Sequence, residues 1–342
     1  VVVPIEGRSD AAREILRGVA DAQERFKNAG GADDRLIEII IANDGNDPNI
    51  AASVAQKLAE NPEVLGVVGH NSSSATKGAL PVYERNDIAV ISPTSTSTDL
   101  NSQTFFRTVP SDAEMGQQLA SYATEKLNAS KALAFYVEGS NYSKSLLDAF
   151  RSNFSGELVD EVDLSVDDFN FDNAIAAIPA DVDVLLLFPN TDMTLRAIGI
   201  AKANRKLSDS KRFALLGGDA LYQGKTLTEG GAAVEGIVLA VPWFADTTYA
   251  DTAASRWGGQ VSWRTASSYD AAQAFAYALS GDASRESTLQ AIKDTDLDGE
   301  ETSGNPLKFD GEGDRAEDPL LVKATKDGNK PQGSEFGFEL LN

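Results

Sequence analysis

Short apolar runs alternate with helical periodicity along most of this chain. The first helical pattern places its apolar residues on one face, at Ile15, Leu16, Val19, Ala22 and Phe26, and two glycines at 30 and 31 end it. A strand is predicted over 36–42 and a second helix over 48–58. This alternation is the pattern expected of a parallel sheet covered by helices, and it predicts a doubly wound α/β lobe.

The same alternation restarts after residue 110 and predicts a second lobe of the same class. Helices are predicted from Asp112, from Ser143, near Ala174 and over 193–203, with strands over 132–137, 158–162, 182–188 and 213–217. A strand over 236–244, an aromatic helix over 269–279, a short helix over 287–292 and a closing strand pair, 307–310 with 320–324, complete the chain.

The order of these elements predicts three connections between the lobes. If the chain returns to the first lobe near Pro242 and leaves it again near Asp310, three strands form a hinge. We therefore expect lobe 1 to comprise residues 1–110 plus 241–312, and lobe 2 to comprise residues 111–240 plus 313–342. A three-stranded hinge suits a protein that clamps a ligand between two lobes.

Composition narrows the classes of function. With 342 residues and 42% hydrophobic content, the chain can bury two cores. It carries 30 Lys and Arg against 52 Asp and Glu, and the net charge of -22 would repel nucleic acid and anionic membranes. The lack of Cys excludes disulfides and thiol nucleophiles, and there is no apolar run of membrane-spanning length. Because the chain opens inside a predicted strand without an initiator Met, we expect that an upstream segment has been removed.

The segment 64–100 carries the strongest candidate chemistry. Its pattern is strand, serine loop, helix, strand and threonine loop, with the loops NSSSATKG and PTSTSTDL directly after the two strands. Small hydroxyls and backbone amides at such positions can hold a small anion such as a carboxylate, and a helix beginning after Ser73 would add its dipole. The alternative is that these Ser and Thr residues act only as helix caps and turn residues.

The sequence resembles the type I periplasmic ligand-binding proteins, in the branch of the leucine/isoleucine/valine-binding proteins of ABC importers and the extracellular ligand-binding receptor domains. The resemblance covers essentially the whole chain and rests on the order and spacing of several motifs. These are VVGHNSSSAT, ISPTSTST, FFRTVPSD, EGSNYSKSL, LLGGDALY, EGIVLAVPWF, SSYDAAQAFAYAL and LKFDGEGDR.

The resemblance implies a set of ligand-binding residues. In the family, the two hydroxyl loops hold the α-carboxylate of the ligand, an aromatic residue closes over the ligand, and an acidic residue pairs with its ammonium group. The matching positions here are, for the carboxylate, Ser72, Ser73, Ser74, Thr94, Ser95 and Thr96, with Tyr142 as the aromatic residue and Asp219 as the acid. The alternatives are packing for Tyr142 and a helix cap for Asp219.

One position departs from the family pattern. Where the family has an aromatic residue after the 182–188 strand, this chain has Pro189 and Asn190, so an amide contact from Asn190 is expected in place of aromatic packing. The preference of the family for branched-chain amino acids therefore does not carry over. Arg8 is a cation near the first loop that could meet a distal carboxylate or simply lie in water.

An enzyme is the competing class. The chain lacks GxGxxG after a strand, GxxxxGK[ST] and GxSxG, and a single His, His70, without any Cys leaves few catalytic combinations. The acidic run that includes Asp44 and Asp47 lacks the spacing of a calcium loop. We predict no enzymatic activity, no cofactor and no metal.

The predicted function is that of an extracytoplasmic solute-binding protein. It captures a small amino acid, or a close analogue, between two lobes by hinge closure and delivers it to an ABC importer. The alternative is a ligand-sensing receptor domain of the same fold in a signalling protein. We expect a monomer in the periplasm or otherwise outside the cytoplasm, with membrane anchoring through an upstream segment as one option, a permease or a membrane signalling protein as partner, and no binding of nucleic acid.

Overall fold

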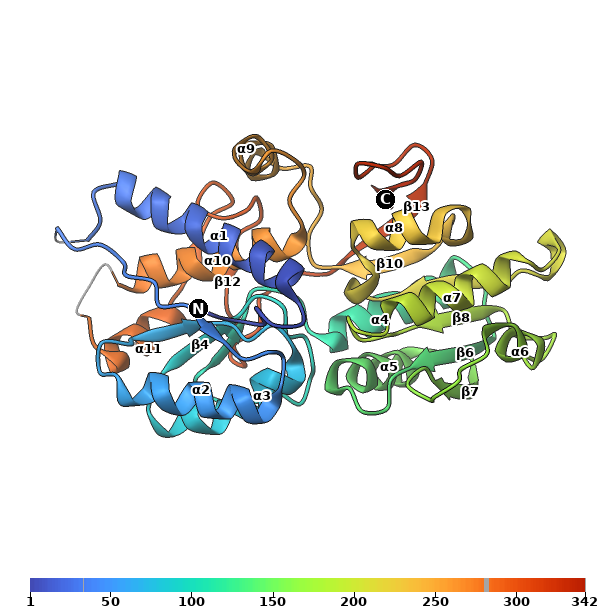
Figure 1. Cartoon of the computed structure of the whole chain (residues 1–342), viewed down its shortest axis with the longest axis horizontal. Coiled ribbons are helices and arrows are strands. Elements are labelled where there is room, and N and C mark those ends of the chain that lie inside the picture. Colours follow the sequence, from blue (N-terminus) through green and yellow to red (C-terminus); the bar gives the residue numbers. More distant parts are fainter. Residues whose placement is uncertain (33, 280–282, 342) are drawn as a thin grey trace. The chain divides into compact units, whose positions relative to one another are not determined.

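The computed structural model describes residues 1–32, 34–279 and 283–341, which form two compact units (Figure 1). Unit 1 comprises Val1–Ser111 and Trp243–Glu317, and unit 2 comprises Asp112–Pro242 and Asp318–Asn342, so the chain passes between them three times. Residues 313–317, which we expected in lobe 2, belong to unit 1. Buried ion pairs hold them there: Arg107 Nε lies 2.5 Å from Asp314, and Arg315 Nη1 lies 2.7 Å from Asp270.

Unit 1 contains three small sheets. The parallel sheet β3-β4-β5 consists of β3 (Gly66–Val68), β4 (Ala89–Ser92) and β5 (Phe105–Arg107). A parallel pair is formed by β1 (Val2–Val3) and β2 (Ala42–Asn43), and an antiparallel pair by β11 (Asp296–Leu297) and β12 (Leu307–Lys308). The helices are α1 (Ser9–Asn28), α2 (Pro48–Glu60), α3 (Ser73–Arg85), α9 (Thr248–Trp257), α10 (Trp263–Ala278) and α11 (Arg285–Lys293).

Both faces of the β3-β4-β5 sheet are buried. Successive side chains of a strand point to opposite faces, and the three strands divide accordingly. One layer packs with α2 and α3 through Val67, Val90 and Phe105, and the other packs with α1 and α10 through Val68, Ile91 and Phe106. Figure 1 shows helices on both faces of this sheet. The doubly wound arrangement predicted for this part of the chain is therefore present.

The prediction of a strand over 36–42 is only partly correct. Only Ala42 and Asn43 pair, in parallel with Val2 and Val3, and residues 36–41 belong to no strand. Leu36 and Ile41 are 60% and 52% exposed. An apolar, β-branched run favours a strand, but a strand also needs a partner, and β1 offers this segment only two paired residues.

Unit 2 is built on one seven-stranded sheet in the order β14-β13-β10-β9-β8-β6-β7. Its strands are β6 (Lys131–Tyr136), β7 (Glu157–Asp163), β8 (Val184–Leu187), β9 (Ala214–Gly217), β10 (Val238–Val241), β13 (Leu320–Thr325) and β14 (Gly337–Leu340). Its helices are α4 (Asp112–Glu125), α5 (Asn141–Asn153), α6 (Phe171–Ala176), α7 (Thr194–Arg205) and α8 (Gly224–Gly230), with 3₁₀ turns η1 (Asp209–Lys211), η2 (Asp219–Leu221) and η3 (Gly231–Val234).

The α/β class is confirmed, but the sheet of unit 2 is mixed, not purely parallel. Five strands run parallel, while β13 pairs antiparallel with both β10 and β14. The expected pairing of 307–310 with 320–324 is wrong, because β12 pairs with β11 and β13 pairs with β10. None of the helices in the described part of the chain combines the length and apolarity needed to cross a membrane.

Candidate functional site

In unit 1 the serine loop and the threonine loop lie side by side. They follow β3 and β4, which are neighbours in a parallel pair, so both loops leave the same edge of the sheet. Several hydrogen bonds join them. The Ser97 amide donates to Ser73 Oγ at 3.3 Å, Thr94 Oγ1 donates to the Asn71 carbonyl at 2.7 Å, and the Thr76 and Ser95 hydroxyls lie 2.8 Å apart.

Several of the predicted ligand-binding hydroxyls have a role inside unit 1. Ser72 is the N-cap of α3 and accepts from the Ala75 amide at 3.3 Å. Ser73 accepts from Ser97, and Thr94 and Ser95 both bond to the backbone carbonyl of His70. These contacts match the capping and turn roles left open by the sequence. They also hold the two loops in one conformation.

Thr96 differs from its neighbours. Its side chain is fully buried, and its Oγ1 has no hydrogen-bond partner within the described residues. A buried hydroxyl without a partner costs free energy, which a ligand can recover by accepting or donating a hydrogen bond. Ser74, the second residue of α3, is partly buried. Thr96 therefore offers a hydroxyl that the fold itself does not use.

The start of α3 adds electrostatic attraction for an anion. The helix has 13 residues, and the first-turn amides of a helix have no partners within that helix. The Ala75 and Thr76 amides donate to the side chain and the carbonyl of Ser72, so the amides that precede them, together with the helix dipole, favour a carboxylate at the N-terminus. This end of α3 stands directly at the two hydroxyl loops, so charge-neutral groups make up the anion-binding half of the candidate site.

His70 is buried beneath the two loops and contacts them through its backbone carbonyl. Its ring is fully buried, with Nδ1 2.6 Å from Asp44 Oδ2 and Nε2 3.0 Å from the Tyr83 hydroxyl. Its carbonyl accepts from Ser92 Oγ at 2.9 Å. Both ring nitrogens are thus occupied by structural partners. Asp44 also accepts from the Asn46 amide at 3.0 Å, as a turn residue does.

In unit 2 the predicted residues gather at the carboxyl ends of three strands. Tyr142 follows β6, Asn190 follows β8 and Asp219 follows β9, and β8 lies between β6 and β9 in the sheet. The Tyr142 hydroxyl accepts from the Ala220 amide at 3.4 Å, which brings it beside Asp219. A Cβ atom at Gly218 would lie 2.4 Å from that hydroxyl, so a glycine at this position leaves the tyrosine room.

The cluster around Tyr142 is strongly negative. Burial raises the pKa of Tyr142 well above its ordinary value, and the charges of Asp219 and Asp112 and a hydrogen bond to Asp219 raise it further. Asp219 is 5% exposed and Asp112 is fully buried. Two buried acidic side chains beside a neutral phenol are chemically suited to a cation such as an ammonium group.

Asp112 lies beside Tyr142 in this cluster, although the sequence analysis did not include it among the candidate site residues. We used it only as the first residue of a predicted helix, which α4 confirms. The available signal was its place at the end of the FFRTVPSD motif, where α4 begins. Its burial beside Tyr142 depends on tertiary packing, which local pattern does not reveal.

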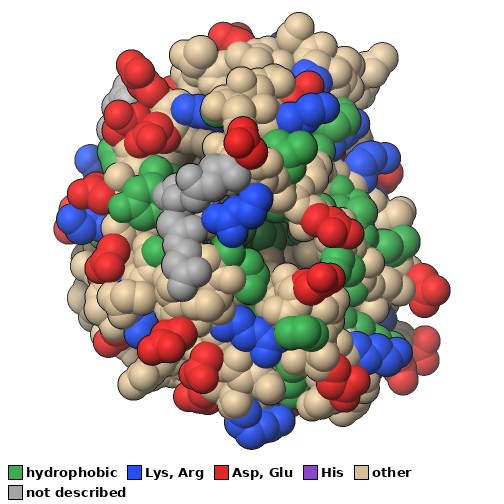
Figure 2. Space-filling view, turned by 90° about the vertical axis from the view of Figure 1, so that its left-hand side faces the viewer, with side chains coloured by type: hydrophobic (Ala, Val, Ile, Leu, Met, Phe, Trp, Pro, Cys, Tyr) green, Lys and Arg blue, Asp and Glu red, His purple; other side chains and the backbone are tan. Residues whose placement is uncertain are grey.

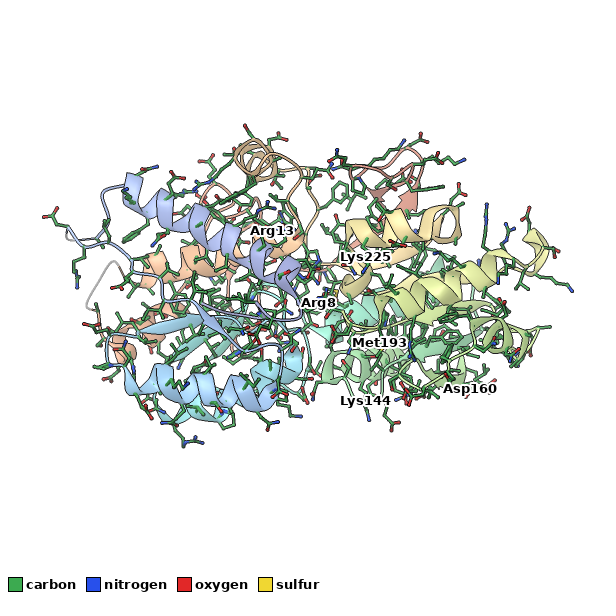
Figure 3. The ribbon with its side chains drawn as sticks, viewed as in Figure 1. Arg8, Arg13, Lys144, Asp160, Met193 and Lys225 are labelled. Atoms are coloured by element: carbon green, nitrogen blue, oxygen red, sulfur yellow. The ribbon has the colours of Figure 1, made fainter. Side chains whose placement is uncertain are left out.

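Asn190 and Arg8 both have local partners. Asn190 Oδ1 accepts from the Met193 amide at 3.0 Å, ahead of α7. Arg8 precedes α1, and its Nε lies 3.3 Å from Asp10. Figure 3 marks Arg8, and it marks Lys144 and Met193 near the starts of α5 and α7. Arg8 is therefore held by a neighbouring carboxylate.

The sequence matches the family model described as periplasmic binding protein over residues 1–329. The chain belongs to this family. It is 25% identical over 317 residues to the leucine-specific-binding protein of Salmonella typhimurium, covering 87% of this chain and 82% of the relative. The prediction of a type I periplasmic ligand-binding protein is confirmed, and so is the prediction of a non-enzymatic, ligand-binding role.

Solved structures share the fold over nearly the full chain. The branched-chain amino acid transporter substrate binding protein LivJ from Streptococcus pneumoniae, in complex with isoleucine, has a TM-score of 0.84 at 20% identity and covers 99% of this chain and 97% of its own. A solute binding protein of an ABC transporter from Rhodopseudomonas palustris, in complex with 3,4-dihydroxy benzoic acid, also has a TM-score of 0.84, at 18% identity with 98% and 94% covered. One fold therefore carries chemically different ligands.

Across the described residues, no group of three or more His, Asp or Glu side chains is arranged to hold a metal ion.

Proposed function

We propose that this protein is an extracytoplasmic solute-binding protein that captures a small α-amino acid between its two units and delivers it to an ABC importer. The observation that carries the proposal is the division of polar chemistry between the units. Unit 1 presents hydroxyls and helix amides suited to a carboxylate, and unit 2 presents buried carboxylates suited to an ammonium group. An α-amino acid carries both groups on one carbon.

The carboxylate half of this proposal rests on the first turn of α3 and on Thr96. The amides at the N-terminus of α3 provide hydrogen-bond donors, and Thr96 Oγ1 provides a buried hydroxyl. Ser73, Thr94 and Ser95 fix the loop geometry through their internal hydrogen bonds. The hydroxyl loops thus act mainly as a rigid frame, with a smaller number of direct contacts than the sequence suggested.

The ammonium half rests on Asp219, with Tyr142 and Asp112 beside it. The carboxylate of Asp219 pairs with the ammonium, and Asp112 adds negative potential. Asn190 uses its Oδ1 within the turn, so its Nδ2 group is the donor it presents to the ligand side chain. Closure follows because a ligand that contacts both units stabilises the state in which both contacts are made.

The names of relatives support this choice of ligand class. The relative in Salmonella typhimurium is named for leucine, and the LivJ structure contains isoleucine. An aromatic carboxylate, as in the Rhodopseudomonas palustris structure, offers no cation for the Tyr142 cluster. A sensing domain that signals to a membrane partner remains the second candidate, since it would use the same ligand site.

A ligand panel tests the proposal. Thermal unfolding is followed with the twenty α-amino acids, with their des-amino acids and with their amides, each at the same concentration. A ligand at 100 times its Kd stabilises the folded protein by about 2.7 kcal/mol. We expect stabilisation by a subset of α-amino acids alone, because removal of either charged group breaks one half of the site. Stabilisation by benzoates or des-amino acids, with no response to any α-amino acid, refutes the proposal.

A further inference from the structure

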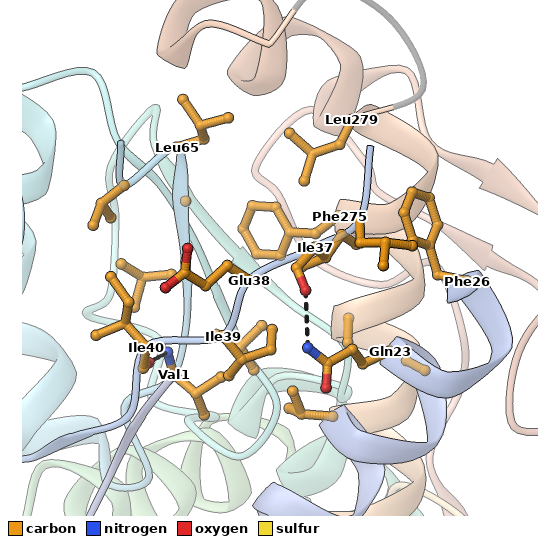
Figure 4. A pocket seen from close by; sticks show the side chains of 18 of the residues that line it. Val1, Gln23, Phe26, Ile37, Glu38, Ile39, Ile40, Leu65, Phe275 and Leu279 are labelled. Atoms are coloured by element: carbon orange, nitrogen blue, oxygen red, sulfur yellow. Dashed lines mark hydrogen bonds between the residues drawn. The ribbon is translucent and has the colours of Figure 1, made fainter. Parts of the chain in front are cut away.

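The apolar groove of unit 1 lies apart from the hydroxyl loops. It has a volume of about 310 Å³ and is lined by α1, α10 and the segments 35–40 and 63–68 (Figure 4). Figure 2 shows a hollow with apolar side chains on the face that it presents. None of the lining residues belongs to the serine loop or the threonine loop. The side chain of a ligand held at the hydroxyl loops therefore has to be accommodated by other residues.

Asn71 is a polar side chain of the serine loop that the fold uses only in part. It is the first residue of the NSSSATKG segment and is 6% exposed. Its Nδ2 group donates to Asn46 Oδ1 at 3.2 Å, and its backbone carbonyl accepts from Thr94 Oγ1. Its Oδ1 has no hydrogen-bond partner within the described residues. Because a buried amide oxygen without a partner costs free energy, a ligand that donates to this oxygen would gain binding energy.

Thr96 belongs to the loop that runs alongside Asn71. The two neighbours of Thr96 bond to residues on either side of Asn71: the Ser95 hydroxyl donates to the His70 carbonyl at 3.3 Å, and the Ser97 amide donates to Ser73 Oγ. Thr96 Oγ1 and Asn71 Oδ1 are thus two buried oxygens without partners in adjoining loops of the described chain. Because Thr96 is assigned to the ligand carboxylate, Asn71 is suited to a second group of the same ligand.

Asn46 turns this position into a pair of amide side chains. It follows β2 in a left-handed conformation with φ 63°, which Asn adopts more readily than most residues. The loop after β2 is joined to the loop after β3 by the Asn71–Asn46 bond and by the contact of Asp44 with His70 at 2.6 Å. Asn46 uses its Oδ1 in the first bond, so its Nδ2 group is the donor that it offers to other partners. The pair therefore presents one acceptor and one donor.

We propose that Asn71 and Asn46 form a side-chain subsite that selects α-amino acids whose neutral side chain carries both a hydrogen-bond donor and an acceptor. Carboxamide and hydroxyl side chains have this chemistry. The donor of the ligand side chain bonds to Asn71 Oδ1, and its oxygen accepts from Asn46 Nδ2. This inference rests on the proposed function, because it places the α-carboxylate of the ligand at α3 and Thr96.

The subsite discriminates through the cost of an unpaired oxygen. An apolar side chain of the same shape leaves Asn71 Oδ1 buried without a partner, and a site built for hydrogen bonding rejects such a ligand strongly. Asp44 and Asp47 lie in the same loop as Asn46. We therefore expect a carboxylate side chain to bind less well than the corresponding carboxamide, because like charges repel.

Matched ligands test the selectivity by isothermal titration. Threonine is compared with valine, and asparagine with leucine, because the members of each pair have a similar shape but differ in hydrogen bonding. Asparagine and glutamine are also compared with aspartate and glutamate. We expect at least one polar ligand to bind at least tenfold more tightly than its apolar partner, and each carboxamide to bind more tightly than its acid. The pair with the larger ratio tells a hydroxyl ligand from a carboxamide ligand.

Replacement of Asn71 by Leu assigns the selectivity to this side chain. Asn71→Leu removes the acceptor at nearly constant size, and Asn71→Ala is the second variant if the first does not fold. The control is Asn28→Leu, the same substitution at an exposed residue at the far end of α1. We expect Asn71→Leu to weaken binding of the preferred polar ligand at least tenfold without weakening its apolar partner, and Asn28→Leu to change neither affinity.

Other outcomes overturn the inference. Equal affinities within both pairs, or tighter binding of the apolar members, show that no such subsite exists in the unmodified protein. A polar preference that persists in Asn71→Leu belongs to other residues. An equal loss for the polar and the apolar ligand assigns Asn71 a purely structural role. If no α-amino acid binds at all, the proposed function itself fails, and this subsite fails with it.

Discussion

Replacement of Asp219 by Asn examines the ammonium half of the proposed site most directly. The substitution keeps the size of the side chain and one accepting oxygen, but it replaces the other oxygen with an NH2 donor and removes the charge. Asp219 is 5% exposed, so a bound ammonium would lose a partner in a poorly solvated place. Truncation of one partner of a buried charge pair costs roughly 2 to 4 kcal/mol in binding. At 1.4 kcal/mol per factor of ten, Kd should rise by roughly 30-fold to 700-fold.

Isothermal titration with the best α-amino acid of the panel measures this loss. Asp160→Asn is the matched control, because Asp160 is an exposed acid on β7 of the same unit. The pKa of Tyr142 provides a second measurement. The charge of Asp219 raises this pKa, so Asp219→Asn should lower it. Unchanged affinity together with a lowered Tyr142 pKa refutes the ammonium contact while confirming the geometry. Equal losses for an amino acid and its des-amino analogue also refute it.

Two further predictions concern other parts of the molecule. Thr96→Val should raise the melting temperature, because it removes a buried hydroxyl that has no partner in the described part of the fold, and it should weaken ligand binding by about 1 kcal/mol in calorimetry. Arg315→Ala should lower unfolding stability by about 3 to 5 kcal/mol in urea titrations, since it leaves the buried Asp270 carboxylate uncompensated.

Periodicity predicted where helices and strands form but not which strands pair. The pattern over 36–42 indicated a strand because it is apolar and β-branched, yet β2 contains only Ala42 and Asn43. Pairing depends on a neighbour that lies elsewhere in the sequence. The same limit explains the error at 307–310 and 320–324, whose apolar patterns carried no information on their partners, and the absence of β14 from the prediction.

For the candidate site, the sequence predicted where the residues lie better than it predicted what each side chain contacts. The serine and threonine loops lie together as expected, because parallel neighbouring strands end at one edge. Whether a hydroxyl there faces a ligand or the backbone depends on side-chain geometry. Thr94 and Thr96 are both threonines of the same loop, so the sequence does not distinguish them. The Thr94 hydroxyl donates to the Asn71 carbonyl, whereas the Thr96 hydroxyl has no partner in the described residues. For Asp112 the sequence indicated only the first residue of a helix, but tertiary packing places it in the cluster around Tyr142.

The unequal chemistry of the two halves leads to a final prediction about closure. Under the proposed mechanism, the half in unit 1 binds an anion through dipoles and hydroxyls, whereas the half in unit 2 contains buried carboxylates that repel an anion. A des-amino acid can therefore bind unit 1 weakly but gains nothing from unit 2. A ligand shifts a conformational equilibrium only by its differential affinity for the two states.

Small-angle X-ray scattering separates binding from closure. A saturating α-amino acid should reduce the radius of gyration of the protein, and its des-amino analogue at saturation should leave it unchanged. The radius of gyration of Asp219→Asn should not change when the amino acid binds. The variant lacks the carboxylate of the proposed charge pair, just as the des-amino analogue lacks the ammonium group. If the analogue compacts the protein as fully as the amino acid does, closure is driven by the carboxylate or by the apolar side chain. The buried acids of unit 2 would then have no part in selecting the closed state.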